Sequence, residues 1–277
     1  MGRVRNFISF DLEFWYDSEF IKDKKKASEE NDLIVESVNR IKRILNAHNT
    51  KATFFVTGKI MEKYPNIIKD LSQNGHEIAS HGYSHTMLNE LGRDDFEKEM
   101  ELSREMIKKI TGENPRGFRA PSWSISKDEF WAYKILDNLG FKYSSSLFPV
   151  NMGLYGSSKF PVLPFKPLEN SNLIEIPISP FEVANTRIPF SGGVYFRILP
   201  KKLISFFMKK MNERGKSVFL YLHPWEFCPE IPKVKTSLVG KITTYYGVKN
   251  NEKKLDYILS NFDFCPFKTI FLSDKNL

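Results

Sequence analysis

Three of the chain's five histidines lie within ten residues of one another, in the segment GHEIASHGYSH. Two of them, His81 and His85, are four residues apart. On a helix this spacing puts both imidazoles on one face, where they can reach one cation. A carboxylate would complete the set of two histidines and one carboxylate that is common in catalytic zinc sites. The pattern predicts a metal site; a surface or capping pair of histidines is the alternative.

Two carboxylates, Asp11 and Glu13, stand near the N-terminus in SFDLEFW. The side chains of a strand alternate between its two faces, so these two carboxylates point the same way. One can bind the metal while the other stays free as a general base. The competing interpretation is that one of them only pairs with Arg119 or with a lysine.

Further polar residues stand at the ends of other strand-like runs. Arg119 follows RGF, and His223 closes VFLYL. In a parallel barrel, the active residues gather at the carboxyl ends of the strands. Four separate strands would therefore deliver two carboxylates, three imidazoles and one guanidinium to the same rim. This convergence favours one site built from distant parts of the chain.

A structural role is the first interpretation of the remaining histidines and of the tryptophans near these motifs. His76 lies inside an apolar run, so we expect a core histidine bonded to the backbone, and we expect His48 to be a solvated loop residue. Trp15, Trp123 and Trp225 each flank a site element, where they could wall the pocket by packing or offer a platform to a sugar ring. We expect packing for two of these three.

Strand-like and helix-like segments alternate along most of the chain. The strand-like runs are 7–10, 52–56, 76–80, 116–122, 141–146, 173–179, 217–224 and 268–272. The helix-like runs are 31–48, a short one after Pro65, 94–110, 127–139, 201–213 and 251–261. This alternation, with near-continuous apolar strands, predicts an α/β fold in which seven or eight parallel strands close into a barrel covered by helices.

Two segments do not fit the alternation. Residues 147–170 and 180–200 are rich in proline, glycine and serine, and we expect them to be long loops over one end of the barrel. Long loops in compact domains usually bind ligands or act as lids. No internal repeat or low-complexity linker interrupts the chain, so we expect a single catalytic domain over residues 1–277.

Composition limits the partners and the compartment. The 277 residues are 41% hydrophobic and can bury a sizeable core. No apolar run could span a bilayer, and the N-terminus does not resemble a signal peptide, so we expect a cytoplasmic protein. Cys228 and Cys265 form no spacing motif, so we expect no disulfides. The net charge of +8 favours phosphates, anionic sugars or a membrane surface as partners, while the scattered lysines argue against nucleic acid.

The motifs SFDLE, TFFVTG, GHEIASHGYSH, GFRAPSW and YLHP, in this order, resemble those of the polysaccharide deacetylase family, the carbohydrate esterase 4 or NodB-homology enzymes. They cover most of the chain, from residue 7 to residue 224. The segments GFRAPS, SGGVYFRILP and YLHPWEF are similar to the branch linked to bacterial exopolysaccharide loci. The resemblance implies a distorted (β/α) barrel of the NodB-homology type. It also implies metal-dependent hydrolysis of an N-acetyl group from an amino sugar.

Carried over position by position, the resemblance implies that His81 and His85 bind a divalent metal. Zinc is the usual metal, and cobalt, nickel and manganese stay open. Most of the family has two adjacent aspartates in the first motif, whereas this chain has a leucine between Asp11 and Glu13. We assign Asp11 as the base and Glu13 as the third metal ligand.

The resemblance also implies roles around the two carboxylates. Arg119 would hold the base, His223 would protonate the leaving amine, and the backbone N–H of Ser122 would help to stabilise the oxyanion. The branch often carries an aspartate where this chain has Ser144. Glu226, three residues after His223, is the candidate that would supply the missing charge.

Several readings of the function stay open. The nearest rival to a deacetylase is a deformylase or a small-molecule amidohydrolase of the same superfamily. A different class is a non-catalytic carbohydrate-binding protein, which the complete set of base, acid and ligands disfavours. We expect the substrate to be a cytoplasmic N-acetylated precursor linked to a lipid or nucleotide, with peripheral association at the inner face of the membrane. The sugar, its linkage, the chain length and the oligomeric state stay undetermined.

Overall fold

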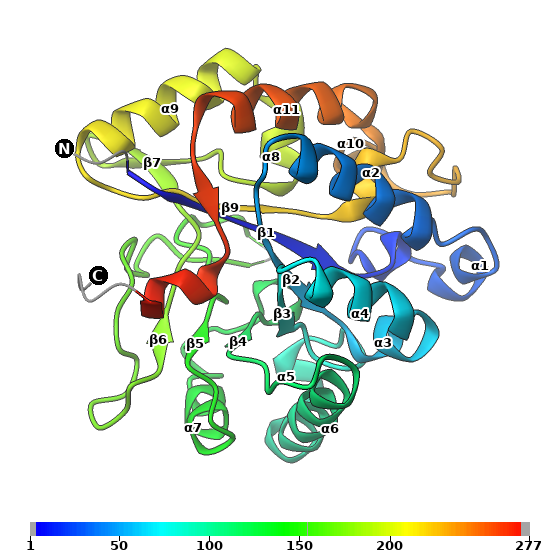
Figure 1. Cartoon of the computed structure of the whole chain (residues 1–277), viewed down its shortest axis with the longest axis vertical. Helices are drawn as coiled ribbons and strands as arrows, with labels where there is room; N and C mark the ends of the chain where they lie inside the picture. The colour runs from blue at the N-terminus through cyan, green and yellow to red at the C-terminus, as the bar shows by residue number, and fades with distance from the viewer. Residues whose placement is uncertain (1–3, 154, 273–277) are drawn as a thin grey trace.

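The computed structural model describes residues 4–153 and 155–272. Its centre is an eight-stranded parallel sheet that curls into a half-barrel, with helices around the outside (Figure 1). The strands run in the order β10-β1-β2-β3-β4-β5-β6, and β9 lies along β1. Their bounds are β1 (Asn6–Leu12), β2 (Thr53–Val56), β3 (Glu77–Ser80), β4 (Gly117–Phe118), β5 (Tyr143–Ser144), β6 (Ile174–Glu175), β9 (Phe219–Leu222) and β10 (Phe264–Cys265). The predicted α/β barrel-like fold is confirmed, as a half-barrel.

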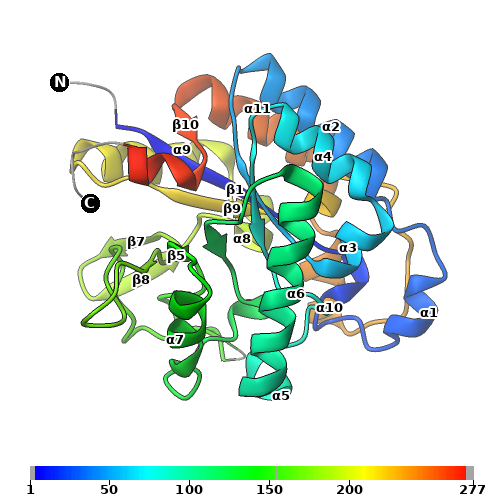
Figure 2. The same ribbon diagram turned by 60° about the horizontal axis from the view of Figure 1, so that its bottom comes forward.

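The helices follow the predicted order, with additions. Their bounds are α1 (Lys24–Ser28), α2 (Ile34–Ala47), α3 (Gly58–Lys63), α4 (Pro65–Gln73), α5 (Leu88–Leu91), α6 (Arg93–Thr111), α7 (Trp131–Asn138), α8 (Gly193–Ile198), α9 (Lys201–Glu213), α10 (Leu238–Tyr245) and α11 (Asn251–Asn261). In the predicted helix α2, Ile34, Val38, Ile41 and Leu45 are buried on one face. Burial of each such side chain contributes roughly 1.5–3 kcal/mol, which fixes the helix on the sheet. Figure 2 shows α2, α4 and α6 along the outer side of the sheet.

Strand β1 sorts its side chains by the two-residue period of a strand. Ile8 and Phe10 pack into the large core cluster beneath the outer helices. Ser9 and Asp11 point the other way and meet Arg119, whose guanidinium contacts both of them. Glu13, just beyond the strand's end, follows the same alternation into the site. The expectation that Asp11 and Glu13 share one face therefore agrees with the structure.

The prediction of a last strand over residues 268–272 is wrong. That segment lies in a 3₁₀ helix, η5 (Phe267–Leu272), and the final strand is β10 just before it. The backbone N–H of Phe267 donates to Oγ1 of Thr53 at 2.8 Å, and that of Lys268 donates to Oε2 of Glu77 at 2.7 Å. Because side chains of β2 and β3 take these hydrogen bonds, the chain turns across the sheet instead of extending it.

The predicted loop over residues 180–200 also differs from the structure. It contains an antiparallel hairpin of β7 (Pro180–Val183) and β8 (Thr186–Pro189), followed by α8. Each strand of the hairpin has only four residues and carries a proline at one end, so the segment shows no strand-like run. After the hairpin, a Cβ on Gly192 would lie 2.0 Å from the carbonyl oxygen of Tyr221. Only glycine allows this close approach, which places α8 beside β9.

Two expectations drawn from composition can be compared with the described residues. No helix within residues 4–153 and 155–272 is both long and apolar enough to cross a membrane. Cys228 and Cys265 are both free thiols, in agreement with the absence of a disulfide framework.

Candidate active site

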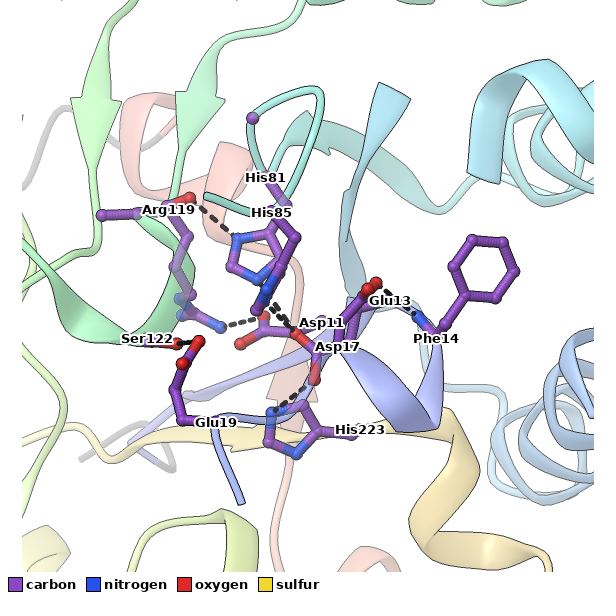
Figure 3. A network of polar contacts seen from close by, with 12 residues as sticks. Asp11, Glu13, Phe14, Asp17, Glu19, His81, His85, Arg119, Ser122 and His223 are labelled. Carbon is purple, nitrogen blue, oxygen red and sulfur yellow. Dashed lines mark hydrogen bonds and ion pairs between the residues drawn. The ribbon is translucent and has the colours of Figure 1, made fainter. Parts of the chain in front are cut away.

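Glu13, His81 and His85 meet at the end of the sheet toward which the parallel strands point (Figure 3). Oε2 of Glu13 lies 3.3 Å from Nε2 of His81 and 2.7 Å from Nε2 of His85. One ligand atom from each residue falls within 4.8 Å of the other two, and all three side chains are buried. These are the three residues that the sequence suggests as metal ligands.

The two histidines do not stand on a helix, contrary to the expectation from their spacing. Residues 81–87 form a loop between β3 and α5. Gly82 has φ +74° and His85 has φ 61°, so two left-handed residues bend the chain until both imidazoles face Glu13. The loop is held by Glu99 of α6, whose Oε2 accepts the backbone N–H of Tyr83 at 3.1 Å. A left-handed histidine is strained, and such strain often accompanies function.

The hydrogen bonding of the three residues fits a divalent cation. Nδ1 of His81 donates to the carbonyl oxygen of Arg119 at 2.8 Å, which orients Nε2 toward Glu13. Nδ1 of His85 is buried without a hydrogen-bond partner among the described residues, while its Nε2 faces the Glu13 carboxylate. Two imidazole nitrogens and one carboxylate form a donor set that suits zinc and leaves open positions.

The electrostatics of Glu13 favour its ionised form. Burial alone would raise the pKa of this carboxyl, but the charges of His85 and His223 and the contacts with His81 and His85 lower it well below its ordinary value. Burial would likewise lower the pKa of His85, but the charge of Glu13 raises it. Metal ligands must be deprotonated, so a bound cation would displace the proton that Glu13 favours on His85.

Asp11 lies outside this ligand set and is held by Arg119. Oδ1 of Asp11 lies 2.6 Å from Nη1 of Arg119, and both side chains are almost inaccessible to solvent. The guanidinium makes three further hydrogen bonds. Nη1 also donates to Oγ of Ser9 at 2.9 Å. Nε donates to the carbonyl oxygen of Ser145 at 3.0 Å, and Nη2 donates to Oγ of Ser145 at 3.0 Å. Arg119 therefore fixes the orientation of the Asp11 carboxylate.

His223 faces Glu13 from β9. Its Nε2 lies 3.8 Å from Oε1 of Glu13, and its ring stacks on Trp225 with centroids 5.3 Å apart. On the other side, Nδ1 lies 3.5 Å from Oε1 of Glu226. Burial would lower the pKa of His223, but the charges of Glu13 and Glu226 raise it to about 9. The two carboxylates therefore favour the protonated form of the imidazole.

Glu226 supplies the charge beside His223. Its Oε2 accepts the backbone N–H of His223 at 3.0 Å, and its Oε1 lies 3.0 Å from Nε of Arg197. Ser144 does not take this part; its Oγ shares a 2.7 Å hydrogen bond with Oγ of Ser146. Our sequence interpretation overlooked Arg197. A single charge between the apolar residues of SGGVYFRILP was the available signal.

The site opens into a cavity of about 340 Å³. Its polar lining includes the three ligands with Asp11 and His223, and its other wall is largely aromatic. The aromatic side chains of the wall are Phe20, Trp123, Tyr155, Tyr195, Tyr221 and Trp225. Ser122, in the left-handed conformation with φ 50°, also lines the cavity, and its hydroxyl donates to Glu19 Oε1 at 3.2 Å.

Other sequence expectations have mixed outcomes. Trp15 is buried away from the cavity and donates its Nε1–H to the carbonyl oxygen of Asn31, so it packs rather than lines the site. His76 is a core histidine whose Nδ1 accepts the backbone N–H of Ala52 at 3.2 Å, as expected. His48 lies in the connection after α2, as expected, and is partly exposed, with Nε2 2.9 Å from Oδ1 of Asp256.

Two family models match the chain one after the other. Residues 28–144 match the model described as "Polysaccharide deacetylase", and residues 145–272 match "Domain of unknown function (DUF3473)". The first of these segments matches the family that the motifs resemble, in agreement with that resemblance. The boundary follows β5, yet β5 and β6 on either side of it pair in one sheet.

Proteins of known name are similar to parts of this chain. The peptidoglycan-N-acetylglucosamine deacetylase of Bacillus cereus is 36% identical over 89 residues, which are 32% of this chain and 32% of that protein. The chitooligosaccharide deacetylase of Azorhizobium caulinodans is 32% identical over 84 residues, 29% of this chain and 40% of that protein. These matches span less than half of either relative.

One solved structure shows the same fold over most of this chain. The crystal structure of a Mycobacterium smegmatis protein described as a polysaccharide deacetylase has a TM-score of 0.61 at 22% identity, and the match covers 96% of this chain and 87% of that one. At this identity the match shows that the two proteins share a fold.

Proposed function

We propose that this protein is a metal-dependent deacetylase that removes N-acetyl groups from an N-acetylated amino sugar. One observation carries the proposal: a buried set of side chains able to bind a metal lies between a fixed carboxylate and the imidazole of His223. Glu13, His81 and His85 form the ligand set, while Asp11 and His223 provide the base and the acid. Hydrolysis of an amide needs these three aids, because an amide is a poor electrophile with a poor leaving group.

Each side chain has a distinct part in the proposed reaction. When bound, a divalent cation would polarise the amide carbonyl and lower the pKa of water. Asp11, oriented by Arg119, takes a proton from the attacking water, and His223 gives its proton to the amide nitrogen as the carbon–nitrogen bond breaks. The backbone N–H of Ser122 would stabilise the negative charge that develops on the carbonyl oxygen. Acetate and the free amine leave.

The cavity supports a carbohydrate substrate. Aromatic side chains such as Trp123 and Trp225 present flat apolar faces of the kind on which sugar rings pack, next to the polar reacting groups. The relatives act on carbohydrates according to their names. We propose a polysaccharide, an oligosaccharide or a lipid- or nucleotide-linked precursor as the substrate. The same proposal includes zinc as the metal, a role in exopolysaccharide biosynthesis and a cytoplasmic location.

The test is acetate release from N-acetylated oligosaccharides and N-acetylated sugar nucleotides. Enzyme loaded with zinc is compared with Asp11→Asn treated in the same way, and formate is measured beside acetate. The expected result is acetate from the wild type and almost none from the variant. Formate from N-formyl sugars without any acetate would favour the deformylase instead. Bound zinc and bound sugar without either product would favour a carbohydrate-binding protein.

A further inference from the structure

Helix α10 presents an unusual apolar face to solvent. Leu238 is 75% exposed, Val239 57%, Ile242 41% and Tyr246 58%. Leu238, Val239 and Ile242 lie on one side of the helix, and Tyr246 directly follows its last residue, so we treat the four side chains as one strip. Contiguous exposed apolar strips on globular proteins commonly mark interaction sites.

The strip borders the active-site cavity. Val239 and Thr243 of α10 line that cavity together with the catalytic side chains. The helix is also tied to the acid histidine, because Nη1 of Arg197 donates to the carbonyl oxygen of Tyr246 at 2.7 Å and Nη2 donates to that of Thr243. Arg197 in turn pairs with Glu226 beside His223. A partner on this strip would therefore sit at the mouth of the site.

Only positive charges surround the strip along the chain. Residues 231–250 contain four lysines and neither aspartate nor glutamate. Lys233, Lys235, Lys241 and Lys249 are all exposed. We call these four lysines together with Leu238, Val239, Ile242 and Tyr246 the α10 surface.

A second basic segment adjoins the α10 surface. Just before α10, Oγ1 of Thr236 donates to the carbonyl oxygen of Phe20 at 2.6 Å, which ties this segment to the loop that carries the sequence KDKKK at residues 22–26. The loop with α1 and the segment leading into α10 lie together at the edge toward which β1 points (Figure 1). The lysines of KDKKK therefore lie in a segment that adjoins the α10 surface.

We infer that the α10 surface docks on the surface of an anionic phospholipid bilayer. Apolar side chains of a helix lying in the interface enter the boundary between headgroups and acyl chains, while flanking lysines contact anionic headgroups. This inference rests on the proposed deacetylase function, since docking would bring the N-acetyl sugar of a lipid-linked substrate to the cavity. A second copy of the chain fits less well, because a two-fold contact would bring the same four lysines against each other.

The test is co-sedimentation of the full chain with vesicles of phosphatidylcholine, with and without phosphatidylglycerol. We expect binding only to the anionic vesicles, weakened by salt. The double variant Leu238→Ser/Ile242→Ser should bind at least about tenfold more weakly, and Lys233→Glu/Lys235→Glu should lose binding as well. Leu102→Ser on α6, where the leucine is 42% exposed, is the matched control and should bind like the wild type.

Four other outcomes overturn the inference. Absence of wild-type binding excludes docking, and equal binding by Leu238→Ser/Ile242→Ser shows that the strip takes no part. Binding to soluble heparin that only the lysine variant abolishes would identify a polyanion site. A dimer in analytical ultracentrifugation that Leu238→Ser/Ile242→Ser dissolves would identify a second copy as the occupant. Vesicle binding without acetate from any sugar would leave the docking intact and refute the deacetylase. Circular dichroism checks that each variant is folded.

Discussion

Arg197 and Glu226 form an ion pair in which each side chain is only 1% exposed, with Nε and Oε1 3.0 Å apart. The pair connects α8 with the segment after β9, and the same Glu226 oxygen faces Nδ1 of His223. Burial would raise the pKa of Glu226, but Arg197 and His223 lower it. Arg197 does not reach the reacting atoms of the proposed reaction, so it is a positioning residue for the acid.

Replacing Arg197 by methionine should reduce both stability and turnover. Removal of one partner from a buried ion pair leaves an uncompensated charge and costs about 3–5 kcal/mol of unfolding free energy. We expect Arg197→Met to lower kcat more than it raises KM, because Glu226 would no longer be held beside His223. Arg197→Lys should restore part of kcat. Urea unfolding and steady-state kinetics measure both effects, and an unchanged kcat in a folded Arg197→Met protein would contradict the positioning role.

Exchanging the two carboxylates for amides should separate their roles. Asp11→Asn should keep the metal and lose about 10²–10⁴-fold in kcat/KM, as is typical when a general base is removed. Glu13→Gln should lose both metal and activity, because an amide oxygen is a weaker ligand than a carboxylate. Metal content after gel filtration, measured by mass spectrometry, distinguishes the two. Retention of metal by Glu13→Gln and its loss from Asp11→Asn would reverse the assignment.

The sequence was sufficient to predict the residues that meet at the site, because barrel strands deliver their terminal side chains to one rim. It predicted α2 and α9 because their apolar residues recur with the helical period over more than three turns. The prediction from the sequence failed for segments whose local structure is decided by long-range contacts. The HGYSH loop bends at a left-handed His85, and no local pattern distinguishes that bend from a helix.

The missed elements share a physical cause. Helix α8 depends on the close approach of Gly192 to Tyr221, and η5 depends on hydrogen bonds to Thr53 and Glu77, which lie about 200 residues earlier in the chain. Helix α10 lacks an amphipathic pattern directed at the core, because its apolar residues face solvent. Arg197 was missed because its partner Glu226 lies in another element.

Removing the metal ligands should abolish metal binding without unfolding the sheet. We expect His85→Ala to lose bound zinc, whereas His48→Gln, a histidine at the end of α2, should retain it. Zinc present at a hundred times its dissociation constant should stabilise the wild type by about 2.7 kcal/mol and leave His85→Ala unaffected. Thermal unfolding with zinc and with a chelator measures this difference. Equal stabilisation of both variants would place the metal elsewhere.

The pH dependence of stability should contain a contribution from His76, which is remote from the proposed metal ligands in β1 and the HGYSH loop. Burial, with smaller contributions from nearby lysines, lowers the pKa of His76 to about 4. Between that value and the ordinary histidine pKa of about 6.5, the unfolded chain binds a proton that the folded chain does not, so stability rises with pH in this window. The contribution is complete above pH ~6.5 and is lost as the pH falls toward ~4, amounting to about 3 kcal/mol.

His76→Gln is the variant that tests this contribution, because glutamine can still accept a hydrogen bond from Ala52 but does not titrate. We expect the difference in unfolding free energy between the wild type and His76→Gln to shift in favour of the variant as the pH falls from 7 to 4.5. Urea unfolding at a series of pH values measures it. A difference that stays constant over this range would mean that the folded protein accepts the proton on His76 without cost, so that the imidazole is accessible to water despite its position beneath Phe54.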